Sequence, residues 1–135
     1  MNITEDYVSF EVAKLLKEKG FHEPCIATYN STTKNFQVEE IYEDWTIHWK
    51  GYISVPTQQM AMKWLREKHK LYIGINIEVG DIQMLPSYDF EETVLGYNFV
   101  IYNEETLMWA FKDKTTRSYE GAVESALKYC LENLI

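Results

Sequence analysis

The chain has 135 residues, with 13 Lys+Arg against 21 Asp+Glu, and so carries a net charge of −8 at pH 7. Its hydrophobic content of 46% and charged content of 25% are ordinary for a folded protein and exclude a disordered chain. The acidity argues against binding to nucleic-acid phosphates, which requires a basic face. The length suits one domain over residues 1–135.

The N-terminus and the two cysteines favour a cytoplasmic protein. Acidic residues follow Met1 closely, where a signal peptide would carry a basic segment and then an apolar run. No stretch approaches the ~20 apolar residues needed to cross a bilayer, so we expect no membrane partner. Cys25 and Cys130 are too few and too far apart for a disulfide framework, and both thiols are expected to be free, with Cys25 partly exposed.

The first predicted helix covers residues 5–19. Thr4 is a good N-cap for it, and Gly20 suits the left-handed position just after the helix. Phe21 can then pack back on Leu16, as in a Schellman ending. Short strands follow at residues 25–30 and 36–40, joined by a polar turn.

Residues 45–50 alternate between large apolar and polar side chains, which predicts a third strand. A second helix follows, with Thr57 as its N-cap and an apolar face that continues to His69. Residues 71–79 alternate most regularly and predict the strongest strand of the chain.

The last third of the chain predicts a loop, a hairpin and a helix. Residues 81–92 contain Pro86 and four acidic residues and are typical of a loop or flap. Residues 95–101 and 107–111 flank a polar turn and predict a hairpin. Apolar residues between Ala122 and Leu134 form a wide stripe, which predicts a helix capped by Ser118.

This order of elements predicts an α+β fold, α-βββ-α-βββ-α, with an antiparallel sheet of about six strands and three helices on one face. The last two helices each follow strands and begin at a hydroxyl residue, Thr57 or Ser118. That similarity suggests a weak ββα duplication.

No pattern typical of catalysis, metal binding or nucleic-acid binding is present. The α-βββ-α order of the first half matches that of double-stranded-RNA-binding domains, but the turn before Thr57 has no cation to contact phosphates. His22, His48 and His69 lack ligand spacing, and the sequence has no nucleophile motif. We therefore expect no cofactor, metal or nucleic-acid partner. The missing catalytic motif favours a non-catalytic protein, and an enzyme stays an open alternative.

The aromatic residues divide into two groups. The four tryptophans fall on predicted apolar faces, so they are expected to fill the core; they are Trp45, Trp49, Trp64 and Trp109. Five tyrosines fall in loops or on the outward side of strands: Tyr42, Tyr52, Tyr72, Tyr88 and Tyr102. Because surface tyrosine is enriched at protein interfaces, these five predict a face that binds a protein partner.

Two segments carry a resemblance. Residues 57–69, TQQMAMKWLREKH, and residues 118–135, SYEGAVESALKYCLENLI, resemble segments of uncharacterised small proteins of gut Bacteroidales and their phages. The resemblance covers about a quarter of the chain. It implies an accessory protein of a phage or mobile element in a bacterial cytoplasm, and it implies no activity.

Three functions are compatible with these observations. The first is a protein-binding or regulatory module without catalysis, either monomeric or as a homo-oligomer. The second is an acidic mimic of nucleic acid that inhibits a host defence protein, although interspersed lysines such as Lys14 and Lys17 count against it. The third is a small-ligand binder or enzyme whose site lies under the loop at residues 81–92.

Overall fold

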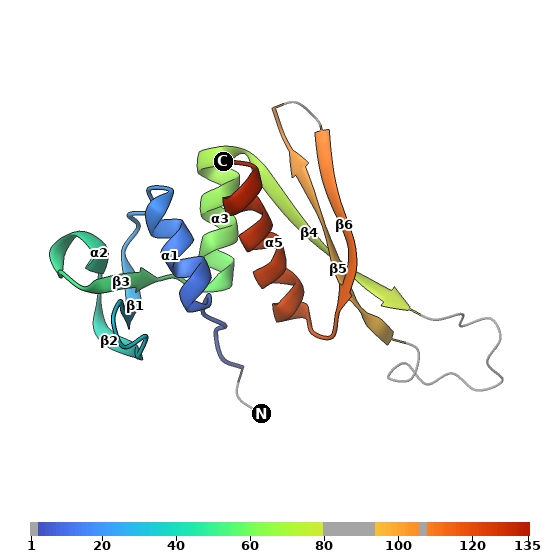
Figure 1. The fold of residues 1–135 in the computed structure, drawn as a ribbon. Coiled ribbons are helices and arrows are strands. Elements are labelled where there is room, and N and C mark those ends of the chain that lie inside the picture. Colours follow the sequence, from blue (N-terminus) through green and yellow to red (C-terminus); the bar gives the residue numbers. More distant parts are fainter. Residues whose placement is uncertain (1–2, 80–93, 106–107) are drawn as a thin grey trace.

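The computed structural model describes residues 3–79, 94–105 and 108–135. In chain order the elements are α1 (Phe10–Glu18), β1 (Cys25–Asn30), β2 (Phe36–Glu43), α2 (Trp45–His48), β3 (Tyr52–Val55), α3 (Gln58–His69), β4 (Leu71–Val79), β5 (Val94–Asn103), β6 (Met108–Thr116) and α5 (Tyr119–Asn133). Helices and antiparallel strands occur together, so the predicted α+β class is confirmed (Figure 1).

The strands form two separate sheets, and the expectation of one sheet of about six strands was wrong. Strand β1 lies between β2 and β3 in the first sheet, and β5 lies between β4 and β6 in the second. The chain leaves β3 through α3, and Lys70 then turns it into β4 with a left-handed backbone, φ 58°. The different strand orders of the two sheets also give no support to a ββα duplication.

Three helices lie between the two sheets, where the sequence predicted helices on one face of one sheet (Figure 1). Helix α1 packs on β3 and α5, while α5 also packs on β4, β5 and β6. A single cluster of buried apolar side chains extends from Ile53 and Val55 of the first sheet to Ile73 and Phe99 of the second. The helices therefore cover the apolar faces of both sheets at once.

The predicted strand at residues 45–50 was wrong. Residues Trp45–His48 form the short helix α2, and β3 begins only at Tyr52, after Gly51 with a φ of 87°. The helix forms because the Asp44 side chain caps it by accepting a hydrogen bond from the Ile47 amide at 3.4 Å. The alternation of large apolar and polar side chains at residues 45–50, which is typical of a strand, therefore occurs here in a short helix and the turn after it.

Helix α1 begins later than predicted, because Ser9 rather than Thr4 is its N-cap. The residues before it are held by the segment that leads into α3: Val8 donates its amide to the Pro56 carbonyl at 3.1 Å, and the Gln58 amide donates to the Asp6 carbonyl at 2.8 Å. The predicted Schellman ending is confirmed, since Gly20 has a φ of 89° and the Phe21 amide donates to the Leu16 carbonyl at 2.9 Å.

The other predicted helices and the last hairpin are confirmed. Thr57 caps α3 by accepting from the Met60 amide, and Ser118 caps α5 by accepting from the Gly121 amide. Strands β4 and β5 pair from Leu71 opposite Asn103 onwards, and β5 pairs with β6. The loop predicted at residues 81–92 lies outside the described residues.

The choice of N-cap gives a test with a matched control. Replacing Ser9 by alanine removes the oxygen that accepts from the Val12 amide, and should lower the free energy of unfolding by about 1 kcal/mol. Thr4→Ala should change it by less than about 0.5 kcal/mol. Urea unfolding followed by circular dichroism measures both, and equal losses for the two variants would contradict the assignment.

Candidate functional site

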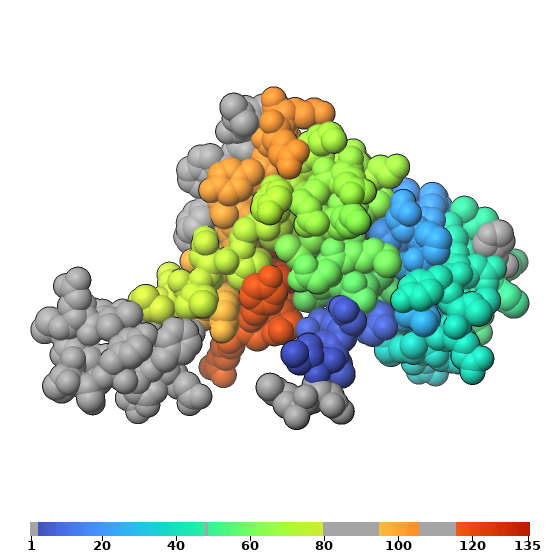
Figure 2. All heavy atoms as spheres, turned by 180° about the vertical axis from the view of Figure 1, so that it is seen from behind, coloured from blue at the N-terminus to red at the C-terminus, as the bar shows by residue number. Residues whose placement is uncertain are grey.

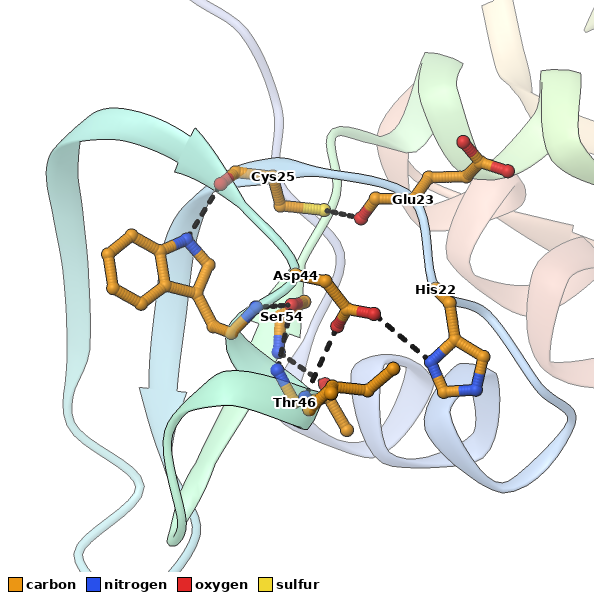
Figure 3. Close-up of polar contacts among 8 residues, drawn as sticks. His22, Glu23, Cys25, Asp44, Thr46 and Ser54 are labelled. Carbon is orange, nitrogen blue, oxygen red and sulfur yellow. Dashed lines mark hydrogen bonds and ion pairs between the residues drawn. The ribbon is translucent and has the colours of Figure 1, made fainter.

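The candidate site lies on the first sheet, on the face away from α1. Ile53 and Val55 of β3 are buried in the core, so Ser54 between them points to the opposite face. Helix α2 packs on β3 at that face. The Trp45 amide donates to the Ser54 hydroxyl oxygen at 2.8 Å, and the Trp45 indole Nε1 donates to the Cys25 carbonyl at 2.7 Å (Figure 3). These bonds fix one tryptophan of α2 over the sheet.

Ser54 and Thr46 bind each other reciprocally. The Ser54 amide donates to Thr46 Oγ1 at 3.1 Å, and the Thr46 amide donates to Ser54 Oγ at 3.3 Å. Ser54 is only 3% exposed, so its hydroxyl oxygen accepts two backbone amides away from water. A buried acceptor with this role holds α2 on the sheet.

His22 and Asp44 form the second attachment of α2. His22 Nδ1 lies 3.3 Å from Asp44 Oδ2, and this contact joins the segment after α1 to the cap of α2 (Figure 3). A catalytic triad would also require a nucleophile bonded to the histidine. Ser54 and Cys25 bond to other groups: the Ser54 hydroxyl oxygen accepts from the Trp45 amide, and Cys25 Sγ donates to the Glu23 carbonyl at 3.4 Å. The pair therefore has the geometry of a structural contact.

Both cysteines are unpaired, as predicted, and both are buried. Cys25 is 1% exposed, so the expectation that it is partly exposed was wrong. Burial, with smaller contributions from Asp44 and Glu23, raises the pKa of the Cys25 thiol to about 12. Burial also raises the pKa of Cys130 to about 12. Neither thiol is suited to act as a nucleophile near neutral pH.

A hollow of about 370 Å³ opens beside α2 on this face of the sheet. Its lining residues come from β2, α2, the turn after α2 and β3: Gln37, Glu39, Trp45, Trp49 and Tyr52. The rings of Trp45 and Trp49 lie 5.9 Å apart at 34°. Trp49 is 50% exposed, so the prediction that it fills the core was wrong. Trp45 and Trp64 are buried as predicted, and the side chain of Trp109 lies outside the described part.

The carboxylates around this hollow are held by neutral donors. Trp49 Nε1 donates to Glu43 Oε2 at 3.3 Å, and the Thr28 hydroxyl donates to Glu39 Oε1 at 3.5 Å. Within the described residues, the ion pairs all involve other carboxylates: those of Asp44, Glu67 and Glu11. The hollow therefore combines exposed aromatic surface with a carboxylate that no described cation neutralises.

The predicted tyrosine face divides into two places. Tyr42 and Tyr52 are exposed on the first sheet. Tyr72 and Tyr102 are exposed on the second sheet, where they lie directly opposite each other on β4 and β5. Tyr88 lies outside the described residues. The expectation that these tyrosines form one face was therefore wrong for the four that are described.

Tyr42 marks a second depression, between β2 and α3. Together with Met60 it lines two adjoining hollows of about 440 and 260 Å³, one of which also contains Trp64 and Lys63. Figure 2 shows the face on which α3 lies beside the segment before β1 and the region of β2. The exposed side of β2 is thus bordered by hollows on both sheet faces.

Sequence reasoning missed Glu39, Ile41, Ile47 and Trp49 as surface residues of this region. The signal that could have found α2 is Asp44, an N-cap residue placed just before Trp45. The sequence of β2 contains no such signal, because its apolar residues are exposed while Glu39 and Glu43 are half-buried, the reverse of what hydrophobicity predicts.

Comparison with known protein families, curated proteins and solved structures found no match. In the part of the chain that the structure describes, no helix is long and apolar enough to cross a membrane. The same residues contain no group of three or more His, Cys, Asp or Glu that could hold a metal ion.

The raised pKa values give a prediction for thiol labelling. A pKa of about 12 instead of 9 leaves roughly a thousandfold less thiolate at pH 8. We expect the folded protein to react with a thiol reagent only as fast as it unfolds, and the urea-unfolded chain to react at once at both cysteines. Rapid stoichiometric labelling of the folded protein would contradict the burial of these thiols.

The attachment of α2 gives a second prediction. Ser54→Ala leaves the Trp45 and Thr46 amides without their acceptor and should lower the free energy of unfolding by about 1–3 kcal/mol. Ser31→Ala is the matched control, because Ser31 makes an exposed bond to the Gly51 carbonyl, and it should cost less than about 0.5 kcal/mol. Urea unfolding followed by tryptophan fluorescence compares the two.

Proposed function

We propose that the chain is a non-catalytic protein-binding module, and that its partner presents a basic segment to the surface formed by β2 and α2. This β2–α2 surface extends around the edge strand β2 and over both faces beside it. Phe36 and Val38 lie opposite Tyr29 and Ala27 of β1, Tyr42 lines the hollows beside α3, and Trp49 and Tyr52 line the hollow beside α2. The exposed Ile41 and Ile47 and the acidic residues between Phe36 and Tyr52 complete the surface. The observation that carries the proposal is the gathering of large exposed apolar side chains over this short stretch.

The concentration of apolar side chains is uneven along the chain. Fifteen large hydrophobic residues are exposed in the described part, and seven of them lie between Phe36 and Tyr52. Scattered apolar residues on a surface need no explanation, but a cluster rimmed by polar groups is typical of a protein-binding site. Tryptophan and tyrosine contribute most to such sites, and Trp49, Tyr42 and Tyr52 belong to this cluster.

The charge of the same region indicates the chemistry of the partner. Between residues 36 and 55 the chain contains four acidic residues and one lysine: Glu39, Glu40, Glu43, Asp44 and Lys50. Two of the acidic residues, Glu39 and Glu43, accept hydrogen bonds from side chains of the first sheet and its connection. A basic segment of the partner complements this surface and is also attracted by the net charge of −8.

The irregular register of β2 favours binding through side chains. On β1, Cys25 lies opposite Glu43 and Ala27 lies opposite Val38, so the intervening residues of β2 form a bulge. Strand β2 lies at the edge of its sheet, where a partner strand could pair with it. The bulge interrupts such pairing, and we propose that the partner contacts the outward side chains instead.

The alternative of a nucleic-acid mimic requires a face lined by acidic residues alone. A hollow between α1 and α5 instead mixes both charges, with three glutamates and three lysines: Glu11, Glu18, Glu132, Lys14, Lys34 and Lys128. Lys128 and Glu11 also form an ion pair at 3.2 Å. These contacts favour the protein-binding proposal. The alternative of a ligand site under residues 81–92 lies outside the described residues.

The proposed cellular context rests on residues 57–69 and 118–135, the two segments that resemble small proteins of gut Bacteroidales and their phages, and it is part of the same proposal. These two segments contain the whole of α3 and the whole of α5, each with its N-cap, and the buried apolar residues of both helices belong to the core. We propose an accessory protein of a phage or mobile element, acting in a bacterial cytoplasm.

Affinity capture with matched variants tests the proposal. The variant Tyr42→Ala/Trp49→Ala removes two rings from the β2–α2 surface, and Tyr72→Ala/Tyr102→Ala removes two rings from the second sheet. We expect a protein that is retained by the wild type and by the second-sheet variant but lost with the β2–α2 variant. The purified pair should then bind at least about tenfold more weakly with the β2–α2 variant, and more weakly as salt rises.

Two outcomes would contradict this proposal. One is a partner whose binding depends on Tyr72 and Tyr102 and is unchanged in the β2–α2 variant. The other is the absence of any reproducible partner in lysates of the natural host. Circular dichroism of each variant confirms that a loss of binding is not a loss of folding.

A further inference from the structure

The hollow beside α2 has the composition of a site for an organic cation. We infer that it receives the ammonium group of a lysine side chain, presented by the basic segment of the partner. This inference rests on the proposed function, and it names the contact that anchors the partner.

The first observation is the aromatic lining. Three of the five residues around the hollow are Trp45, Trp49 and Tyr52. Aromatic ring faces attract ammonium groups, and tryptophan does so most strongly. The indole N–H groups of both tryptophans already donate to protein oxygens, Trp45 to the Cys25 carbonyl and Trp49 to Glu43. The rings are therefore held in place before any ligand binds, and a ligand pays little for their ordering.

The second observation is the charge inside the hollow. Glu39 lines it and accepts a long hydrogen bond of 3.5 Å from the neutral Thr28 hydroxyl. Glu43 lies outside the lining and accepts from Nε1 of the lining residue Trp49 at 3.3 Å. Among the described residues neither carboxylate forms an ion pair. An ammonium group would be attracted by the aromatic rings and by the carboxylate at the same time. A neutral ligand would gain neither attraction, and an anion would be repelled by the carboxylate.

The dimensions fit a side chain and its terminal group. A volume of about 370 Å³ is at the small end of the range for ligand pockets. Gln37 supplies an amide at the same place, with acceptor and donor groups for the peptide that carries the lysine. The exposed Tyr42 and Ile47 lie outside the lining, so they are available to the rest of the partner segment.

Titration with matched peptides tests the inference. The probes are short capped peptides that carry lysine, trimethyl-lysine or norleucine at one position, where norleucine has a hydrocarbon chain without the charge. The indole N–H signals of the full-length protein in NMR spectra report the site. We expect lysine and trimethyl-lysine peptides to shift the signals of Trp45 and Trp49, which line the hollow. The signal of Trp64 should stay unchanged, because Trp64 lies outside the lining and packs on Phe21.

Protein variants identify the groups responsible. Glu39→Gln keeps the size of the side chain and an acceptor for Thr28, and should weaken binding of the lysine peptide about threefold to tenfold. Glu104→Gln is the control, because this exposed glutamate lies in the turn after β5, away from the first sheet, and it should change binding less than about twofold. Trp49→Ala should weaken binding about tenfold and Trp49→Phe less, whereas Tyr72→Ala, which removes an exposed ring from the second sheet, should have little effect.

Several results would overturn the inference. They are equal binding of the norleucine peptide, unchanged Trp45 and Trp49 signals at the highest soluble peptide concentration, or equal effects of Glu39→Gln and Glu104→Gln. If the peptides fail while a partner still depends on the β2–α2 surface, the ammonium site is wrong and the proposed function stands. If the lysine peptide binds at the hollow while no protein partner is captured, the proposed function is wrong and the hollow is a site for a free alkylammonium compound.

Discussion

A helix of four residues cannot sustain itself in water, so α2 exists only because β3 and β1 hold it. The buried Ser54 hydroxyl accepts the amides of Trp45 and Thr46, and the Trp45 indole reaches the Cys25 carbonyl. These few bonds decide where both tryptophans of the site lie. Ser54 and Thr28 are two buried hydroxyl residues of this small sheet. Each has a hydrogen-bond partner, since Ser54 accepts from the two α2 amides and Thr28 donates to Glu39, so neither hydroxyl is left unsatisfied.

The placement of the helices has a second effect on the surface. Helix α1 packs on the first sheet, α3 and α5 pack on the second, and α1 contacts α5, so the inner faces of both sheets are buried in one core. The first sheet uses its outer face for α2 and the hollow beside it, and the second presents the opposed pair of Tyr72 and Tyr102. Aromatic residues are therefore available for contact with other molecules without weakening the interior.

Local signals were sufficient for most helices but not for their assembly. Thr57, Ser118 and Gly20 mark helix ends through backbone hydrogen bonds within a few residues, which a sequence displays directly. Whether β4 pairs with the first sheet depends on how α3 packs between strands that are distant in the sequence. A local sequence pattern carries no information on that packing. The alternation of Trp45, Ile47 and Trp49 led to the wrong prediction of a strand. The helix is stabilised by an acceptor, the Ser54 hydroxyl, that comes later in the chain and does not show in the local pattern. Tyr42 and Tyr52 were correctly predicted as exposed, while their separation from Tyr72 and Tyr102 follows from the division into two sheets.

The bulge in β2 has a consequence for the behaviour of the protein in a crowded solution. An edge strand with exposed Val38 and Ile41 would normally be a template on which further chains could stack and form fibres. The shift of register between Val38 and Glu43 breaks that template in the middle, and the glutamates of the same strand repel a second copy. The chain can thus keep large apolar side chains exposed to water on an edge strand and still resist self-association.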